Sequence, residues 1–116
     1  MTKLNSTAIT VTKEISHNVQ NIIGDRLRKI ILYGSYARGD YKDYSDLDIM
    51  VLANMDEREC KALESKMDTI VSDIGLEHDI IISVLINNEN LFMRRLAVSP
   101  FYRNVLSEGV EIYGTY

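Results

Sequence analysis

The sequence predicts one small α+β domain, and three observations support that class. The 116 residues fit a single domain, because domains cluster around roughly 100 to 150 residues. Hydrophobic residues make up 46% of the chain and charged residues 26%, a composition typical of folded globular proteins. Apolar residues recur with helical spacing in two long segments, and short β-branched runs lie between and after them. The chain is therefore expected to build helices and strands around one core.

The first element is predicted to be an amphipathic helix over residues 11–23. Its apolar positions are separated by three or four residues, which places them on one face of a helix, and Gly24 follows as a stop. These positions are Val11, Ile15, Val19, Ile22 and Ile23.

Two strands are predicted next, with an unusual loop between them. Leu27–Tyr33 is short, rich in isoleucine and followed by Gly34, which favours a buried strand. Residues 34–45 hold glycines, tyrosines and alternating charges without a sustained apolar period, so they predict a loop with room for one helical turn. Residues 46–53 form a second apolar run that opens with acidic residues, and they predict the second strand.

A second helix and a third strand are predicted after this loop and strand pair. Asp56 is a suitable N-cap for the helix, and Gly75 stands where a C-terminal cap is expected. Residues 77–86 are strongly β-branched and predict a strand, with Asp79 near its start among apolar neighbours. The helical spacing rests on Leu63, Met67, Ile70, Val71 and Ile74.

The last quarter of the chain is predicted to be mostly helical. Residues 91–106 hold one or two short helices that are interrupted near Pro100. Residues 110–113 form either a last short strand or a tail that docks on the domain.

Composition excludes several classes of protein. The longest apolar runs are far shorter than the roughly 20 residues that cross a bilayer. Residues 1–10 lack the apolar stretch of a signal peptide, so a cytoplasmic protein without membrane contact is expected. Cys60 has no partner for a disulfide or a zinc site and is interpreted as an inert helix residue. A net charge of -4 disfavours direct nucleic-acid binding, which needs a basic face, but it permits a small anionic ligand held by a metal and backbone amides.

Two carboxylates at the start of the second strand are the main candidates for chemistry. Asp46 and Asp48 lie two residues apart, so on a strand they point to the same side and repel each other unless a cation lies between them. Two acids on a solvated strand edge are the alternative interpretation. Mg²⁺ suits such a pair, since it takes one or two protein carboxylates and completes its shell with water and phosphate oxygens.

Two further features complete a hypothetical phosphoryl-transfer site. Asp79 is predicted to complete one metal site and to accept the proton of an attacking hydroxyl, although it could instead be a strand-end residue that reaches solvent. Gly34 and Ser35 are predicted to cradle a triphosphate with their backbone amides and the serine hydroxyl, because a residue without Cβ lets the backbone approach a phosphate closely. Alone, the Gly-Ser dipeptide would indicate only a turn.

These residues in this order resemble the signature of the DNA polymerase β-like nucleotidyltransferase superfamily. The signature is Gly34-Ser35, ten intervening residues, and then Asp46-Leu47-Asp48. The fuller strings over residues 34–39 and 45–48 are similar to those of the minimal nucleotidyltransferase (MNT) proteins, and the resemblance extends over most of the chain. It implies a small mixed β-sheet flanked by helices, the polymerase β palm-like fold.

The resemblance also implies roles for individual residues. Asp46 and Asp48 would hold magnesium, Asp79 would be the third acid on a later strand, and Gly34 with Ser35 would bind the triphosphate. Arg38 lies in the matching Ala-Arg-Gly stretch, where it would either reach a phosphate or hold the loop by pairing with an acid such as Asp40 or Asp43.

MNT proteins commonly occur beside HEPN-domain ribonucleases in toxin–antitoxin pairs, and this sequence resembles the antitoxin. The resemblance implies transfer of AMP from ATP to a tyrosine hydroxyl of the HEPN toxin, within a hetero-oligomer of the two proteins. Two other functions stay open: an antitoxin that only occludes the toxin, and a nucleotidyltransferase for a small molecule that depends on a separate acceptor-binding subunit.

Several other residues are interpreted as structural. His17 and His78 have no second histidine or cysteine at ligand spacing, and Arg94 and Arg95 are typical of a solvated helix face. The tyrosines around the motif either contact a partner, undergo self-modification, or are ordinary loop and sheet aromatics; they are Tyr33, Tyr36, Tyr41 and Tyr44.

Overall fold

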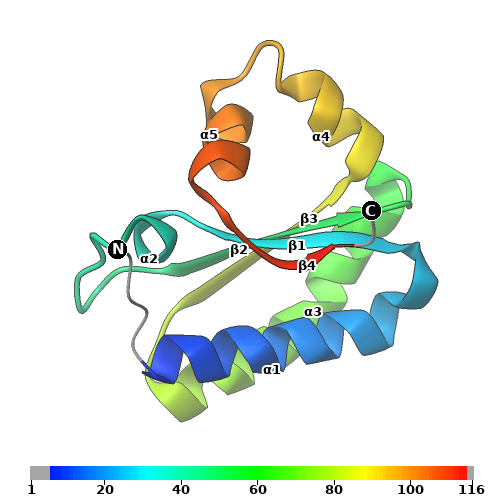
Figure 1. The fold of residues 1–116 in the computed structure, drawn as a ribbon. Helices are drawn as coiled ribbons and strands as arrows, with labels where there is room; N and C mark the ends of the chain where they lie inside the picture. The colour runs from blue at the N-terminus through cyan, green and yellow to red at the C-terminus, as the bar shows by residue number, and fades with distance from the viewer. Residues whose placement is uncertain (1–5, 115–116) are drawn as a thin grey trace.

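The computed structural model describes residues 6–114, which form ten helical and strand elements (Figure 1). Met1 to Asn5, which belong to the segment screened for a signal peptide, lie outside the described residues. The helices are α1 (Ser6–Ile23), the 3-10 turn η1 (Gly24–Arg26), α2 (Ser35–Arg38), α3 (Glu57–His78), α4 (Glu89–Arg95) and α5 (Pro100–Glu108). The strands are β1 (Leu27–Tyr33), β2 (Leu47–Ala53), β3 (Ile82–Asn88) and β4 (Val110–Gly114).

The four strands form one mixed sheet in the order β3-β2-β1-β4, which confirms the predicted fold class. β1 pairs antiparallel with β2 and with β4, so the last segment of the chain is a strand rather than a docking tail. β2 and β3 run parallel, and α3 makes the crossover between them. A parallel pair needs such a long connection, since a tight turn cannot return the chain to the same end of the sheet.

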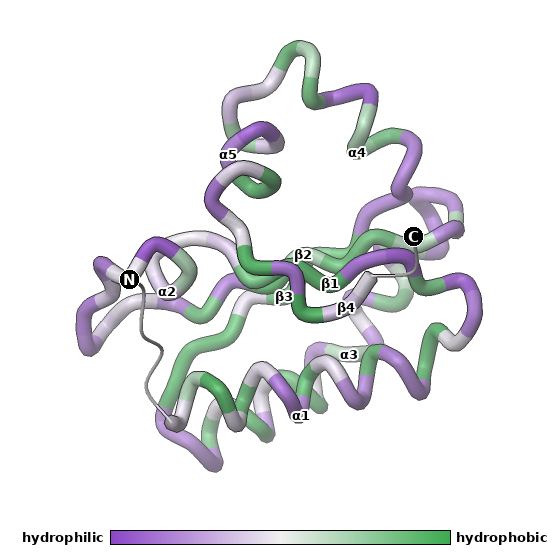
Figure 2. The backbone as a smooth tube through the Cα atoms, viewed as in Figure 1, coloured by the Kyte–Doolittle hydropathy of each residue, from purple (hydrophilic) through white to green (hydrophobic). Residues whose placement is uncertain are grey.

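Helices cover both faces of the sheet (Figure 1). The alternation of side chains along β1 explains the two layers, because Ile30 and Leu32 join the core beneath α1 and α3, whereas Ile31 and Tyr33 join the core beneath α4 and α5. Figure 2 shows apolar residues concentrated where β1 and β2 cross the centre of the domain. On β2, the even-numbered residues face α4 and α5, as the buried Met50 shows.

Within residues 6–114, no helix is long and apolar enough to cross a membrane.

The C-terminal end of α3 differs from the prediction. Gly75 does not cap the helix, which continues to His78 and ends with Asp79 in the left-handed conformation at φ 55°. Gly75 is instead buried inside the helix, where an added Cβ would lie 2.6 Å from the backbone oxygen of Ile80 as the chain turns back. The glycine thus marks a close backbone approach rather than a helix end.

The third strand is correspondingly shorter than predicted. It begins at Ile82 rather than at residue 77, so Asp79 is not a strand residue. Asp79 is exposed and caps α3, which corrects the expectation that it stands among core-facing neighbours.

Candidate active site

The turn after β1 depends on a backbone conformation that glycine alone adopts readily. Gly34 has φ 77° and ψ -157°, a region nearly closed to residues with a Cβ. The added Cβ would also overlap the Asp48 carboxylate oxygen Oδ2. The missing side chain thus allows the Gly-Ser turn to lie directly against the carboxylate at the start of β2.

Asp48 is the better enclosed of the two signature acids. It lies opposite Tyr33 in the β1–β2 register and is half-buried, whereas Asp46 is exposed just before the strand begins. Burial raises the pKa of Asp48, the negative charge of Asp46 raises it further, and the nearby charge of Arg38 opposes both effects. The charge of Asp46 therefore opposes ionisation of Asp48, as expected where two neighbouring acids share a site for a cation.

A cleft of about 350 Å³ opens beside these groups. It combines the end of β1, the Gly-Ser turn, Asp48 and one side of α5. Sequence reasoning missed the α5 side, because no local pattern marks a helix residue that folding brings to a distant turn. The lining residues are Tyr33, Gly34, Ser35, Arg38, Asp48, Phe101, Asn104, Val105 and Glu108.

Arg38 connects the Gly-Ser turn to α5. Its Nε lies 3.2 Å from Asp40 Oδ2, and its Nη1 lies 3.4 Å from Glu108 Oε2. The pairing with Asp40 was one of the two alternatives open from sequence, and the pairing with Glu108 joins two residues that line the cleft. Because all three side chains are substantially exposed, this arrangement orients Arg38 more than it stabilises the fold.

The aromatic residues around the motif fall into two groups. Tyr33 is buried and makes an edge-to-face contact with Phe101 at 5.8 Å, and burial together with Asp48 raises its pKa to about 12. Tyr36 stacks on Tyr41 at 4.4 Å and anchors the loop. Tyr44 differs from these, since 82% of it is exposed.

The structure does not bring Asp79 to the signature acids. It lines a separate groove with the loop residues Asp43, Tyr44 and Ser45, not the cleft that contains Asp48. The residue opposite Asp48 on β3 is Ser83, a half-buried residue that sequence reasoning also missed. The position of Ser83 opposite Asp48 follows only from the pairing of β2 with β3, which the sequence alone does not give.

The donor set of the cleft fits a magnesium ion that is shared with a phosphate ligand. Between Ser6 and Gly114, only Glu14, Glu77 and His78 form a group of three potential metal ligands within reach of one ion. Among the described residues, Asp46 and Asp48 therefore belong to no group of three ligands that could share one ion. Two mutually repelling carboxylates still fit Mg²⁺, which usually completes its shell with water and substrate phosphate oxygens.

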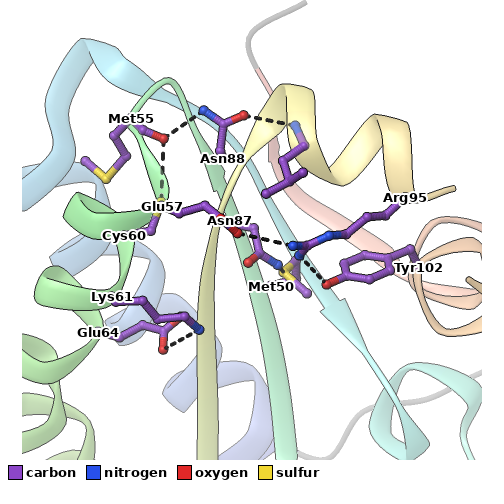
Figure 3. A network of polar contacts seen from close by, with 11 residues as sticks. Met50, Met55, Glu57, Cys60, Lys61, Glu64, Asn87, Asn88, Arg95 and Tyr102 are labelled. Carbon is purple, nitrogen blue, oxygen red and sulfur yellow. Dashed lines mark hydrogen bonds and ion pairs between the residues drawn. The ribbon is translucent and has the colours of Figure 1, made fainter.

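The remaining polar residues have structural contacts. His78 Nε2 lies 2.9 Å from Glu14 Oε1 and links α3 to α1, while His17 is exposed on α1. Arg95 donates to Tyr102 Oη at 2.9 Å and to Glu57 Oε1 at 3.2 Å, in a network that joins α4 to α5 and α3 (Figure 3). Arg95 therefore holds elements together, whereas Arg94 is exposed.

The buried position of Cys60 makes its thiol unreactive. It is 1% exposed on α3, and its Sγ lies 3.7 Å from the backbone oxygen of Met55 (Figure 3). Burial raises the pKa of its thiol to about 11, so the reactive thiolate is scarce at neutral pH.

A mixed sheet that holds a Gly-Ser turn against one of two neighbouring carboxylates is the arrangement of a nucleotidyltransferase domain. The chain belongs to the polymerase beta nucleotidyltransferase family, whose model matches residues 13–115.

Relatives and solved structures agree with this assignment. Two candidate protein adenylyltransferases of Methanocaldococcus jannaschii are 35% identical over 101 residues and 34% identical over 104 residues. The first alignment covers 87% of this chain and 93% of the relative, and the second covers 90% and 97%.

The fold is similar to chains in two toxin–antitoxin structures. One is a Shewanella oneidensis complex of an MNT antitoxin with a tri-AMPylated HEPN toxin, with TM-score 0.52 and 20% identity, covering 93% of this chain and 73% of that one. The other is a toxin–antitoxin structure with AMP-PNP, with TM-score 0.54 and 21% identity, covering 90% and 73%. At this level of identity, the likeness shows the fold.

Proposed function

We propose that this protein is an antitoxin that transfers AMP from ATP to a tyrosine hydroxyl of a cognate HEPN-domain toxin. The observation that carries the proposal is the contact of Gly34 with Asp48 in a cleft, because it holds a phosphate-binding turn against a metal-binding carboxylate. The names of the archaeal relatives and the AMPylated toxin beside a protein of this fold support AMP as the group transferred and a toxin as the acceptor.

The residues of the cleft have separate tasks in this reaction. The backbone at Gly34 and Ser35 and the Ser35 hydroxyl bind the triphosphate. Asp46 and Asp48 hold Mg²⁺, which neutralises phosphate charge when bound. Arg38, oriented by Asp40 and Glu108, lines the cleft, where its guanidinium can contact a phosphate.

The transfer itself forms one bond and breaks one. The tyrosine oxygen bonds to the α-phosphorus of ATP, the bond from that phosphorus to the β-phosphate bridging oxygen breaks, and pyrophosphate leaves. The hydroxyl proton must pass to a base. Asp48 lines the cleft, so it is better suited by position than the exposed Asp79 that the sequence had suggested.

Labelled ATP tests the reaction class. The purified HEPN partner is incubated with this protein, Mg²⁺ and ATP labelled at either the α- or the γ-phosphate. We expect label on the partner from α-labelled ATP alone, since AMP transfer retains the α-phosphate and releases the others. Label from γ-labelled ATP would show phosphorylation instead, and label from neither would refute transfer.

One observation favours a second function, an antitoxin that only occludes its partner. Of the two signature acids only Asp48 lines the cleft, and the residue opposite it on β3 is Ser83 rather than a third acid. Inhibition of the toxin ribonuclease by a double Asp46→Asn, Asp48→Asn variant distinguishes the two functions. If, in the absence of ATP, the variant inhibits the toxin as well as the unmodified protein does, the function is occlusion. If inhibition requires both ATP and the two acids, the function is AMP transfer.

A further inference from the structure

A second groove, outside the cleft, gathers unusually exposed apolar side chains. Tyr44 and Leu76 are each 82% exposed and Ile81 is 66% exposed, although all three are large and hydrophobic. They line one groove of about 570 Å³ between the loop before β2 and the C-terminal end of α3. Such a concentration of apolar surface marks a site of interaction more often than an ordinary solvated face.

The groove is continuous with the start of the strand that carries the signature acids. Ser45, which lines the groove, directly precedes Asp46 in the chain. The backbone nitrogen of Leu47 donates to the backbone oxygen of Ile81 at 2.8 Å, which fixes the groove against the first residue of β2. In Figure 1 the loop before β2 and the C-terminal end of α3 lie at the same end of the domain. A molecule seated in the groove therefore lies beside Asp46.

The rim of the groove is acidic. Asp43 and Asp79 line it, and both are exposed, while the lining contains no lysine or arginine. The net charge of the chain is also negative, at -4. A ligand that matches this surface has an apolar centre flanked by positive charge, because opposite potentials steer association and like charges oppose it.

We infer that this groove is the docking surface for the acceptor protein, which inserts an apolar side chain flanked by lysine or arginine. The inference rests on the proposed function, since it assumes a protein acceptor whose hydroxyl must reach the cleft. Contacts away from the reacting atoms position that hydroxyl and supply binding energy. The separation of the two sites also explains why Asp79 is exposed on the groove rather than placed beside Asp48.

Three matched variants test the docking surface. Leu76→Gln and Ile81→Thr remove exposed apolar area. Gln is a good helix former in α3, and Ile81 lies just before β3, so neither change is expected to unfold the protein. Val98→Thr is the control, because Val98 is 80% exposed but lies between α4 and α5, on the other side of the sheet. For each protein, the KM for the purified HEPN partner and the KM for ATP are measured, and circular dichroism confirms folding.

The inference predicts that the KM for the partner rises about tenfold in Leu76→Gln and Ile81→Thr, while the KM for ATP stays unchanged. Val98→Thr keeps both values, and added salt raises the partner KM of the unmodified protein. An unchanged partner KM in both groove variants would overturn the inference, as would an equal rise in Val98→Thr. If the groove variants instead convert a dimer of this chain into monomers in sedimentation and leave the partner KM unchanged, a second copy occupies the groove.

Calorimetric titration of the partner without nucleotide separates this inference from the proposed function. Binding that Leu76→Gln and Ile81→Thr weaken, in a protein that transfers no AMP, refutes the proposed function and supports the docking surface. If both groove variants bind the partner as well as the unmodified protein does, and AMP transfer is observed, the proposed function is supported and the docking surface is refuted. If the unmodified protein shows no binding and no transfer, both the docking surface and the proposed function are overturned.

Discussion

Gly34 and Asp48 are in such close contact that a side chain on Gly34 would overlap the Asp48 carboxylate. The contact joins the turn that follows β1 to the start of β2. In the antiparallel register of these two strands, Tyr33 pairs with Asp48. It brings the backbone that is proposed to bind phosphate next to the carboxylate that is proposed to bind the metal. The predictions below depend on this geometry.

Gly34→Ala is expected to abolish AMP transfer, because the new methyl group displaces either the turn or the carboxylate. Gly24→Ala is the matched control, since Gly24 also has a positive φ of 68° but has nothing within 4 Å of an added Cβ. Both variants lose roughly 1–3 kcal/mol of stability through backbone strain. Thermal unfolding and transfer assays check the pair, and equal activity in the two variants would contradict the role given to the Gly34–Asp48 contact.

Asp79→Asn is expected to keep its kcat while the KM for the acceptor rises, because Asp79 lies on the groove rather than in the cleft. Asp48→Asn, in contrast, is expected to lower kcat about 100-fold or more, as removal of a transition-state contact does. Steady-state kinetics with ATP and acceptor varied separately distinguish the two. A loss of kcat in Asp79→Asn as large as that in Asp48→Asn would restore the metal-binding role predicted from sequence.

Asp48→Asn is also expected to stabilise the protein at neutral pH in the absence of divalent ions. The pKa of Asp48 is raised in the fold, so ionisation of Asp48 opposes folding. This cost is absent below the unfolded pKa, grows as pH rises toward the folded pKa, and is complete above the folded pKa. Mg²⁺ should offset this cost in the unmodified protein and leave the variant unaffected. Melting temperatures with Mg²⁺ or with a chelator test this, and a variant that melts below the unmodified protein in chelator would argue against it.

Cys60 is expected to resist alkylation in the native protein at pH 8. Its thiol is buried and has a pKa of about 11, so only about a thousandth is ionised at that pH. Mass spectrometry after iodoacetamide treatment, with and without denaturant, measures the reaction. Rapid labelling of the native protein would show that the packing of α3 is looser than the structure describes.

The sequence was most informative where a residue type has one local meaning. The boundaries of β1 matched the prediction because its isoleucine-rich run is followed by Gly34, whose positive φ ends the strand. Gly75 misled because a glycine at a helix cap and a glycine under a close backbone contact look the same in sequence. That error also misplaced Asp79, since the strand was predicted to begin at residue 77, two residues after the glycine.

The second wall of the cleft could not be predicted, because it comes from tertiary structure. Phe101 and Glu108 reach the cleft only when α5 packs on the sheet face that Tyr33 and Asp48 share. Neither residue belongs to a recognisable pattern. Ser83 is a similar case, since only the parallel pairing of β2 with β3 places it opposite Asp48.

The most direct test of the proposed function is the intact mass of the HEPN partner after incubation with this protein, Mg²⁺ and ATP. The same incubation with Asp48→Asn is the control. We expect the partner to gain the mass of one or more AMP groups with the unmodified protein and none with the variant. An equal gain with Asp48→Asn, or no gain with either despite a stable complex, would contradict the assignment of the Gly34–Asp48 cleft as the site of AMP transfer.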